Sequence, residues 1–563
     1  MNPIKQTIHI AKPSRSNGPA KRDPATTQAW LIGGGIASLS AAVHLIHDAN
    51  VTPTHIHILD EHAKAGGGIK SCGNADDGYV LYTGSLPYFH DRCVEELLAL
   101  VPSVENPEQS LLDTIKDSDQ KGAHKQKSTT RLICQGKDGP ECVHITSLQI
   151  GPKYRMELMR IMLENERALG DGCIKDYFDE AFFKTNFWIQ WSTTFALQPW
   201  HSVAEFRRCL CKHLADIEHL NDVKPLDRTK YAVYESIILP IKNYLERLGV
   251  NFHFHTQVTK LQTNPGSPQT ITQILLTDTD TETSPADPAT PNPIEVSPTD
   301  LVLVTLGSTN SGTQTGTNTT PPPSPPADFL TSPLSSWTLW TTLTSPSPSP
   351  TIYGTPTPFH THIPETTLCT FTTTLKSTDF LTRYSTLTSS NPGTGALLTL
   401  ASSPWLLSIS VPAQPICPNQ HPATDIIWGY GLHPFEPGTF VRKPMTECTG
   451  QEIASELLQH LNFPVADLLP HSITIPCVMP LATAPMLPRK PGQRPDVVAG
   501  RPGSGNLGLV GQFVELPDDT TLSMEYSVRG ARVAVDSLMG VGGQPPKIER
   551  HLLLSVFDLL GGA

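Results

Sequence analysis

The sequence predicts an α/β fold, and three neighbouring segments near the start of the chain carry this prediction. An apolar run, 29–32, is followed by the glycine turn 33–38 (GGGIAS) and then by a helix-forming stretch, 39–46. A second apolar run, 56–59, ends in Asp60. A strand, a glycine turn, a helix and a second strand that ends in an acid are typical of the βαβ unit of a Rossmann fold, which binds dinucleotides.

The glycine turn has a physical role at such a site. Gly33 and Gly35 carry no side chain, so backbone amides at a helix N-terminus can approach a pyrophosphate closely. Asp60 offers a carboxylate that can accept a hydrogen bond from a ribose hydroxyl. The third position of the motif is Ser38 instead of glycine, so a plain tight turn is the alternative interpretation of this segment.

Two further glycine segments favour a flavin over a nicotinamide cofactor. Residues 65–68 (AGGG) predict a second flexible loop, where many two-dinucleotide-domain flavoproteins wrap their cofactor. Near the other end, 506–512 predicts a buried strand that closes on Gly511, and an apolar helical stretch reaches residue 538. A late strand, glycine and helix that return to the isoalloxazine are typical of flavoproteins built like glutathione reductase. We therefore predict FAD as the cofactor, in a Rossmann-like domain of the glutathione-reductase type.

The predicted FAD-binding residues come from several separate segments of the chain. They are Gly33, Gly35, Ile36, Ala37, Ser38, Asp60, Glu61, Gly67, Gly68, Gly84, Gly307, Gly511, Glu525 and Ser527.

At 563 residues the chain is too long for one compact core, and two or three lobes are expected. The FAD-binding domain is predicted in three parts, with an α+β substrate domain and helical insertions between them. The predicted segments are a disordered arm (1–27), the FAD-binding parts (28–150, 229–310 and 491–545), a helical aromatic-rich substrate region (151–228), a substrate domain with Thr/Ser/Pro-rich insertions (311–490) and a short C-terminal helix (546–563). Segments 277–300, 309–328 and 345–358 have the Thr, Ser and Pro content of surface insertions.

Composition excludes several classes of protein. The formal net charge of -12 disfavours a nucleic-acid partner, because phosphate binding needs clustered Lys and Arg. The 11 cysteines are scattered without a CxxC pair, so neither a disulfide framework nor a metal site is expected. The sequence carries no secretory signal and no apolar run that could span a bilayer, which predicts a cytoplasmic protein. The C-terminal helix lacks a basic face, which predicts weak or no membrane association.

The middle of the chain, 155–250, is predicted to be helical and is rich in aromatic residues. These residues gather between positions 177 and 200. Large apolar groups at helical spacing usually form core, and core packing is the alternative for any single one of them. As a group they exceed what one helical face needs, which favours a long apolar ligand channel.

At this point the sequence resembles the oleate hydratases, also called the myosin-cross-reactive antigen family. The resemblance covers roughly residues 28–545. It depends on motifs that follow one another in the family's order: 33–39 (GGGIASL), 186–188 (NFW), 199–202 (PWHS), 230–231 (KY), 234–240 (YESIILP), 337–340 (WTLW), 443–448 (KPMTEC), 474–476 (TIP) and 525–529 (EYSVR). The resemblance implies a flavoprotein fold with FAD, a fatty-acid-like ligand, addition of water across an isolated cis double bond, and a homodimer.

Both catalytic groups that the resemblance implies are replaced. Hydration of an unactivated alkene needs a proton donor on one carbon and a water activated on the opposite face. In the family a glutamate beside the flavin handles the water and a tyrosine on a following helix donates the proton; here these positions are Leu86 and Cys209. A leucine cannot accept a proton, and a thiol with a pKa of about 8.5 is a poor acid for an alkene.

Other polar residues in the same region are candidates for proton transfer. Tyr82 or Tyr88 is the preferred acid, and His90 the preferred partner. Tyr88 can equally face solvent, and His90 and His201 can be structural histidines. Glu205 can simply pair with Arg208 at helical spacing.

We therefore predict an FAD-dependent, lyase-type enzyme that acts without net redox on the double bond of an apolar unsaturated substrate. The reaction would be hydration, dehydration, isomerisation or cyclisation. Three alternatives stay open at this point: an oleate hydratase proper, a flavin oxidoreductase in which His90 removes a proton near flavin N5, and a non-catalytic lipid-binding flavoprotein.

Overall fold

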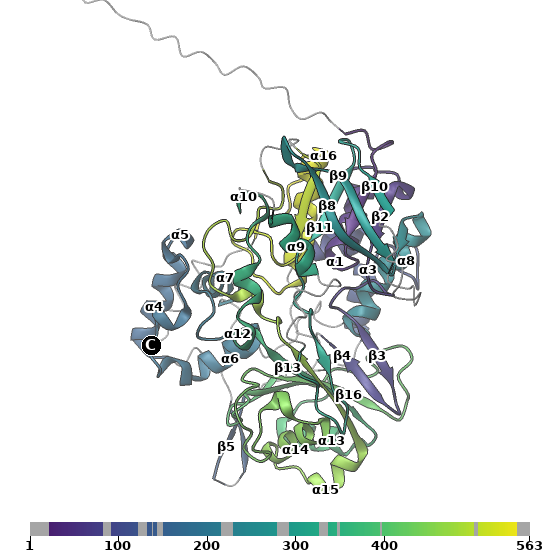
Figure 1. Ribbon diagram of the computed structural model, residues 1–563. Coiled ribbons are helices and arrows are strands. Elements are labelled where there is room, and N and C mark those ends of the chain that lie inside the picture. The colour runs from purple at the N-terminus through teal and green to yellow at the C-terminus, as the bar shows by residue number, and fades with distance from the viewer. Residues whose placement is uncertain are drawn as a thin grey trace, which may run out of the picture.

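The computed structural model describes most of the chain, and its elements form three lobes (Figure 1). The described residues are 22–82, 92–121, 132–137, 139–143, 150–214, 229–278, 292–325, 336–345, 350–393, 397–499 and 505–548. Four predicted site residues, Gly84, Leu86, Tyr88 and His90, lie outside these ranges, as do most of the predicted N-terminal arm and C-terminal helix.

The first lobe is built on a parallel sheet of five strands. Their order in space is β18 (Leu507–Val510), β11 (Leu301–Thr305), β1 (Ala29–Ile32), β2 (Ile56–Leu59) and β7 (Asn251–His253). Every neighbouring pair in this sheet is parallel. Parallel strands covered on both faces need nearly continuous apolar runs, which is the pattern of β11 and β18. The predicted α/β class and Rossmann-type sheet are therefore confirmed.

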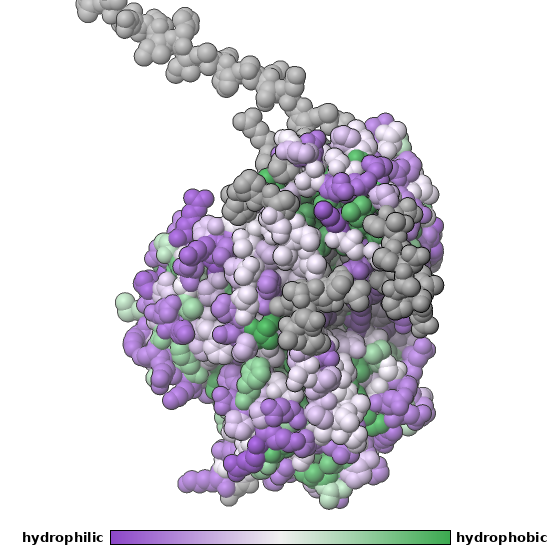
Figure 2. All heavy atoms as spheres, in the orientation of Figure 1, coloured by the Kyte–Doolittle hydropathy of each residue, from purple (hydrophilic) through white to green (hydrophobic). Residues whose placement is uncertain are grey.

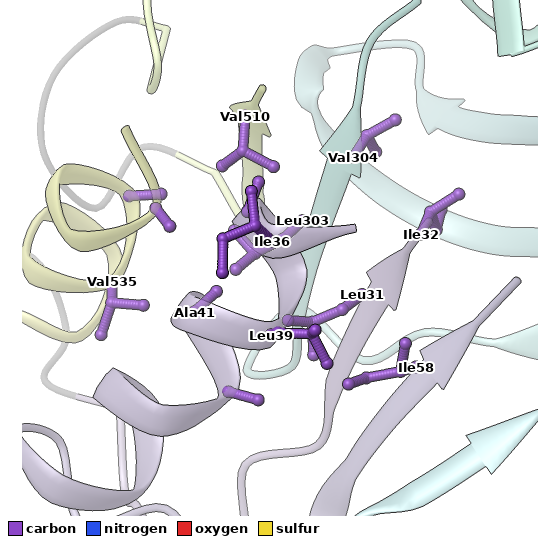
Figure 3. Close-up of a cluster of buried hydrophobic side chains, with 14 of the residues drawn as sticks. Leu31, Ile32, Ile36, Leu39, Ala41, Ile58, Leu303, Val304, Val510 and Val535 are labelled. Carbon is purple, nitrogen blue, oxygen red and sulfur yellow. The ribbon is translucent and has the colours of Figure 1, made fainter. Parts of the chain in front are cut away.

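Helices cover one face of this sheet. They are α1 (Ile36–His47), α2 (Arg92–Leu100), α3 (Leu111–Lys121), α8 (Leu239–Leu248) and α16 (Met524–Met539). Figure 3 shows Leu39 of α1 over Leu31 and Ile58 of the sheet, and Ala41 turned toward Val535 of α16. A five-residue π-helical turn, Tyr234–Ile238, leads directly into α8.

A second layer of this lobe is a three-stranded antiparallel sheet. It consists of β8 (Thr256–Asn264), β9 (Ser267–Asp278) and β10 (Asn292–Glu295). Helix α9 (Ser336–Thr344) packs against β8. Its Trp337 and Trp340 are fully buried and contact Phe513, with ring centroids 4.8 and 5.7 Å apart. The sequence predicts this helix as part of the substrate domain. The burial of its two indoles shows that it belongs to the core of the parallel-sheet lobe instead.

The predicted N-terminal arm ends earlier than expected. Arg22 is buried, and its guanidinium donates to the backbone oxygens of Leu538 (2.6 Å) and Gly505 (2.7 Å). These two bonds attach residue 22 to the parallel-sheet lobe, so the predicted disorder up to residue 27 is wrong for 22–27.

The second lobe is built on an eight-stranded sheet. Its spatial order is β12 (Gln314–Thr315), β17 (Ser472–Met479), β13 (Leu368–Leu375), β16 (Asp425–Gly431), β15 (Leu407–Ser410), β14 (Leu398–Leu400), β5 (Leu132–Gln135) and β6 (Pro140–Val143). One face packs against α13 (Asp379–Thr388), α14 (Gly450–His460) and α15 (Val465–Leu468). Strands β5 and β6 fall in the segment predicted as FAD-binding domain, but Ile133 is buried in this second core.

A short hairpin lies on this sheet and ends beside the candidate site. It consists of β3 (Ser71–Asn74) and β4 (Gly78–Leu81). The backbone N–H groups of Tyr79 and Leu81 donate to the hydroxyls of Thr374 (2.9 Å) and Thr372 (3.0 Å). Threonine side chains of β13 therefore fix the hairpin that carries Tyr82.

The third lobe is helical. It contains α4 (Pro152–Leu163), α5 (Glu166–Leu169), α6 (Asn186–Phe195) and α7 (Val203–His213). Its aromatic side chains pack on one another, as Phe178 and Phe182 do with ring centroids 3.8 Å apart. Most of the aromatic segment is thus the core of this lobe, and Phe195 is the aromatic residue of this segment that lines the cavity described below. Three short helices, α10 (Pro350–Tyr353), α11 (Thr357–His360) and α12 (Ile363–Thr366), precede β13.

On the face drawn in Figure 2, polar residues are spread over all three lobes and apolar ones are scattered among them. Within the described residues, no helix has the length and apolar character needed to cross a membrane.

Candidate functional site

A cavity of about 1060 Å³ lies where the three lobes meet. Four of its wall residues, Gly33, Asp60, Gly307 and Gly511, follow closely on strands β1, β2, β11 and β18. In open α/β sheets, ligands bind at the carboxyl ends of the strands, so this is the expected place for a cofactor. The predicted site residues that line the cavity are Gly33, Gly35, Ile36, Ala37, Asp60, Glu61, Gly67, Gly68, Tyr82, Cys209, Gly307, Gly511 and Ser527.

The glycine turn in the cavity wall leaves room for a phosphate. Gly33 has φ +96°, a conformation that side chains rarely adopt, and Gly35 is the N-cap of α1 without a side-chain cap. A Cβ on Gly67 would lie 3.1 Å from the Cα of Gly35, so two glycine loops meet closely here. The uncapped amides of α1 and the open cradle fit a pyrophosphate.

Two adjacent carboxylates at the end of β2 have different surroundings. Asp60 accepts backbone N–H groups from Gly34 and from His62, the latter at 2.7 Å, so it holds the turn. Glu61 also lines the cavity, where burial and the charge of Asp60 raise its pKa to about 7. The sequence predicts that Asp60 accepts a hydrogen bond from the ribose hydroxyl. Because the Asp60 carboxylate already accepts two backbone N–H groups, Glu61 is the better acceptor for this hydroxyl.

The cavity also holds buried polar atoms that have no hydrogen-bond partner among the described residues. They are Thr305 Oγ1, Asn310 Oδ1 and Ser336 Oγ. Buried polar groups are normally paired, so three such atoms in residues that line one cavity indicate a hydroxyl-rich or amide-bearing ligand. Asn310 is held by its Nδ2, which donates to the backbone oxygen of Gly68 (2.9 Å).

These polar atoms were missed by sequence reasoning. Residues 310–313 line the cavity, although we predicted 309–328 to be a surface insertion without chemical role. The prediction of a surface insertion is wrong for residues 310–313. A Thr/Ser/Pro-rich composition gave no sign that these residues line a cavity. Segment 345–358 is also partly internal, since Tyr353 is buried.

The cavity residues fit FAD. The glycine cradle suits its pyrophosphate, and Glu61 suits a ribose. The three unpaired oxygens suit its remaining hydroxyl and ring polar groups. Gly511, which follows β18, and Ser527 of α16 also line this cavity. This agrees with the prediction that the late strand and helix return to the flavin.

Two predicted cofactor residues lie elsewhere. Ser38 is fully buried within α1 and does not line the cavity. The Glu525 carboxylate accepts the backbone N–H groups of Cys93 (3.2 Å) and Val94 (3.0 Å) and pairs with Arg529 at 2.6 Å. Glu525 therefore holds the start of α2 against α16. It is not one of the residues that line the cavity.

The cavity wall also includes residues of α6, of α7 and of the end of the β3–β4 hairpin. Tyr82 and Cys209 line it together with Phe195, Lys212 and His213. Burial raises the pKa of Tyr82 to about 12, and burial raises the pKa of the Cys209 thiol far above its usual range. Both candidate residues therefore hold their protons near neutral pH, and Lys212 and His213 are ionisable residues that the sequence did not single out.

Behind this wall, α7 is fixed by a buried ionic network centred on Glu205. Its carboxylate meets guanidinium nitrogens of Arg489 (2.7 Å), Arg494 (3.1 Å) and Arg208 (3.5 Å), and it accepts a hydrogen bond from the Thr521 hydroxyl (3.1 Å). Burial alone would raise the pKa of this carboxyl, but the arginines outweigh it and lower the pKa. The pairing of Glu205 with Arg208 was predicted; the other two arginines were not.

The structural interpretation of His201 is supported. The ring is fully buried, its Nδ1 accepts the backbone N–H of Gln198 at 3.1 Å, and burial lowers its pKa to about 3. Among the described residues, no group of three or more His, Cys, Asp or Glu side chains is arranged to hold a metal ion.

Comparison with known proteins agrees with this architecture. The model of the MCRA family matches residues 26–535. The chain is 33% identical to "Oleate hydratase" of Streptococcus pyogenes serotype M49 (strain NZ131), with 91% of this chain and 85% of that protein covered. It is 28% identical to "Linoleate hydratase" of Lactiplantibacillus plantarum, with 92% and 94% covered.

Solved structures give the fold. Cyclohexylamine oxidase from Brevibacterium oxydans IH-35A has a TM-score of 0.51 and 10% identity, with 91% of this chain and 99% of that chain covered. At this identity the likeness concerns the fold alone, and it agrees with the predicted FAD-binding Rossmann-type architecture. The family match over residues 26–535 and the 33% identity to one of its hydratases show that the chain belongs to the MCRA family, as the sequence motifs predicted.

Proposed function

We propose that this protein is an FAD-dependent fatty acid hydratase-like enzyme that acts without net redox on the double bond of an apolar unsaturated substrate. The observation that carries the proposal is one cavity with two unlike sets of wall residues. One set is the glycine cradle and the unpaired polar atoms that fit FAD, and the other includes Tyr82 and Cys209, which hold their protons, and the apolar ring of Phe195.

The substrate class is supported by the two relatives. Their names state activity on oleate and on linoleate, and both of these are long unsaturated fatty acids. The alignments cover 85% and 94% of the relatives' own lengths, so the chain spans most of each of them. We infer a substrate of the same kind, with an apolar chain and an isolated double bond.

The proposed chemistry needs few groups. The double bond takes up a proton on one carbon while water adds to the other, and a dry pocket keeps competing reactions out. Gly35 with the following amides of α1 would hold the FAD pyrophosphate, and Glu61 would hold a ribose hydroxyl. Bound FAD would supply a structural and electrostatic wall to this pocket and no net electrons.

We further propose that, within this class, the preferred substrate is a specialised one and that oleate and linoleate are converted more slowly. Leu86 replaces the water-handling glutamate that the family resemblance implies, and Cys209 replaces the proton-donating tyrosine. The Cys209 side chain is much smaller than a tyrosine and lies on the cavity wall, so it leaves room for a bulkier substrate. Of the acids predicted from the sequence, Tyr82 lines the cavity; Tyr88 and His90 stay as proposals from the sequence. A homodimer is proposed from the resemblance, and sedimentation analysis would test it.

The experiment is incubation of FAD-loaded protein with oleate or linoleate, followed by mass spectrometry of the lipid and by recording of dissolved oxygen. We expect a product heavier by one water, or an isomer of unchanged mass, which forms only with FAD and without oxygen uptake. Oxygen uptake in proportion to product would indicate an oxidoreductase instead. Complete retention of both fatty acids would favour a lipid-binding protein.

A further inference from the structure

The α7 wall of the cavity carries three ionisable side chains within one helical turn. Cys209, Lys212 and His213 all line the cavity. Cys209 and His213 are four residues apart, so they lie on the same face of α7, one above the other. A ligand that contacts the thiol of Cys209 therefore also passes the imidazole of His213.

Lys212 is not free to exchange its proton with a ligand. Its ammonium lies 3.1 Å from Oδ1 of Asp519, a fully buried carboxylate that also meets Nε of Arg529 at 2.8 Å. The charge of Lys212 is thus committed to the ionic network behind α7. Cys209 is equally unsuited, because burial raises the pKa of its thiol and keeps it neutral.

The third side chain, His213, is an imidazole. Imidazole is the side chain that ordinarily takes up and releases protons near neutral pH. The ring lies in the last turn of α7, where the helix dipole favours a positive charge. It stacks on Phe195, with ring centroids 5.1 Å apart and an angle of 26° between the planes. Because Phe195 also lines the cavity, the imidazole is held beside the apolar surface where a hydrocarbon chain would lie.

We propose that His213 is a catalytic residue that protonates the double bond of the substrate. The proposal rests on the proposed function. The imidazolium gives its proton to one alkene carbon, and the π electron pair forms the new C–H bond. Water forms a C–O bond with the other carbon, the protonated alcohol releases one proton to solvent, and the imidazole takes one proton back from solvent. The sum is the addition of one water, without oxidation or reduction.

The test compares FAD-loaded wild-type protein with His213→Gln and His213→Ala, using oleate and linoleate as probes. We expect the rate of product formation to fall about 100-fold or more in both variants, in line with the usual contribution of general acid catalysis. Added imidazole should restore part of the activity of His213→Ala and none of that of His213→Gln. The matched control is His471→Gln, since His471 is an exposed histidine of the second lobe.

The outcomes separate the two proposals. If wild-type protein converts neither fatty acid, the proposed function is overturned, and this proposal with it. If wild-type protein is active and a folded His213→Gln variant keeps its rate, this proposal alone is overturned. FAD absorbance and thermal unfolding establish that the variants are folded. A purely structural role for His213 predicts no rescue by imidazole, so a loss of activity in both variants without rescue also overturns the proposal.

Discussion

The carboxylate of Asp60 accepts the backbone N–H of Gly34, which fixes the glycine turn to the end of strand β2. A Cβ on Gly34 would lie 2.6 Å from Oδ2 of the same aspartate, closer than real contacts allow. The turn and the strand end therefore fit together only because residue 34 is glycine. Their fit determines the shape of the cradle in front of α1.

The first prediction follows from this contact. Gly34→Ala should displace Asp60 and open the turn, at a cost of about 1–3 kcal/mol for overpacking. Flavin content after purification and FAD affinity, measured by flavin fluorescence, should both fall about tenfold or more. Gly151→Ala is the matched control, because a Cβ at Gly151 meets no atom within 4 Å. Unchanged FAD affinity in Gly34→Ala would contradict the assigned cradle.

The second prediction concerns Glu61 and pH. Burial and the charge of Asp60 raise the pKa of Glu61 to about 7, so the side chain is mostly neutral at pH 6 and mostly ionised at pH 8. A ribose hydroxyl donates more strongly to the ionised form, because charge-assisted hydrogen bonds are the stronger ones. FAD affinity should therefore rise as the pH increases through about 7. Glu61→Gln should weaken binding about tenfold and remove this pH dependence. A variant with the wild-type pH profile would contradict the role of Glu61.

The parts of the fold that the sequence predicted are local ones. The unit from 29 to 60 follows from short-range patterns, since strand, turn, helix and strand are adjacent in the chain. The late strand β18 and helix α16 were recognised in the same way. Such patterns also carry the glycines of the cradle, because a glycine turn can be recognised without knowing what faces it.

The parts that the sequence could not predict depend on distant contacts. Glu205 meets Arg494 from 289 positions away, and nothing in either local pattern indicates the other. Asn310 lies in a Thr/Ser/Pro-rich segment whose composition is typical of surface insertions, although the fold brings it to Gly68. Strands β5 and β6 are short and were assigned to the wrong lobe for the same reason. They form a hairpin with each other, but β5 joins the large sheet by pairing with β14, which is far along the chain.

The third prediction is a gain of function at residue 209. The family resemblance implies a proton-donating tyrosine there, and Cys209 lines a cavity of about 1060 Å³ that can take a larger side chain. Cys209→Tyr should raise the rate of oleate hydration about tenfold, because a phenol supplies a general acid. Cys209→Phe has nearly the same bulk without the hydroxyl and should give no increase. Equal rates for the two variants would show that cavity shape alone matters at this position.

The last prediction concerns the buried network behind α7. Glu205 is fully buried, and its removal in Glu205→Ala would leave the charges of Arg489 and Arg494 facing each other without their shared partner. Breaking a buried ion pair on one side costs about 3–5 kcal/mol, so denaturant unfolding should show a loss of this size. Glu157→Ala is the control. Its carboxylate pairs with Arg160 on the exposed side of α4, where a loss below about 1 kcal/mol is expected.

Two measurements on Glu205→Ala, the unfolding free energy and fatty acid binding, separate the stability of the protein from the position of the α7 wall. Since Glu205 lies one turn before Cys209 on α7, loosening the network should also shift the cavity wall. We expect Glu205→Ala to weaken fatty acid binding at temperatures where the variant is still folded, while its FAD absorbance stays near that of the wild type. Equal unfolding free energies for Glu205→Ala and Glu157→Ala would contradict the network. A buried carboxylate shared by three arginines cannot be as dispensable as a partly exposed carboxylate paired with a single arginine.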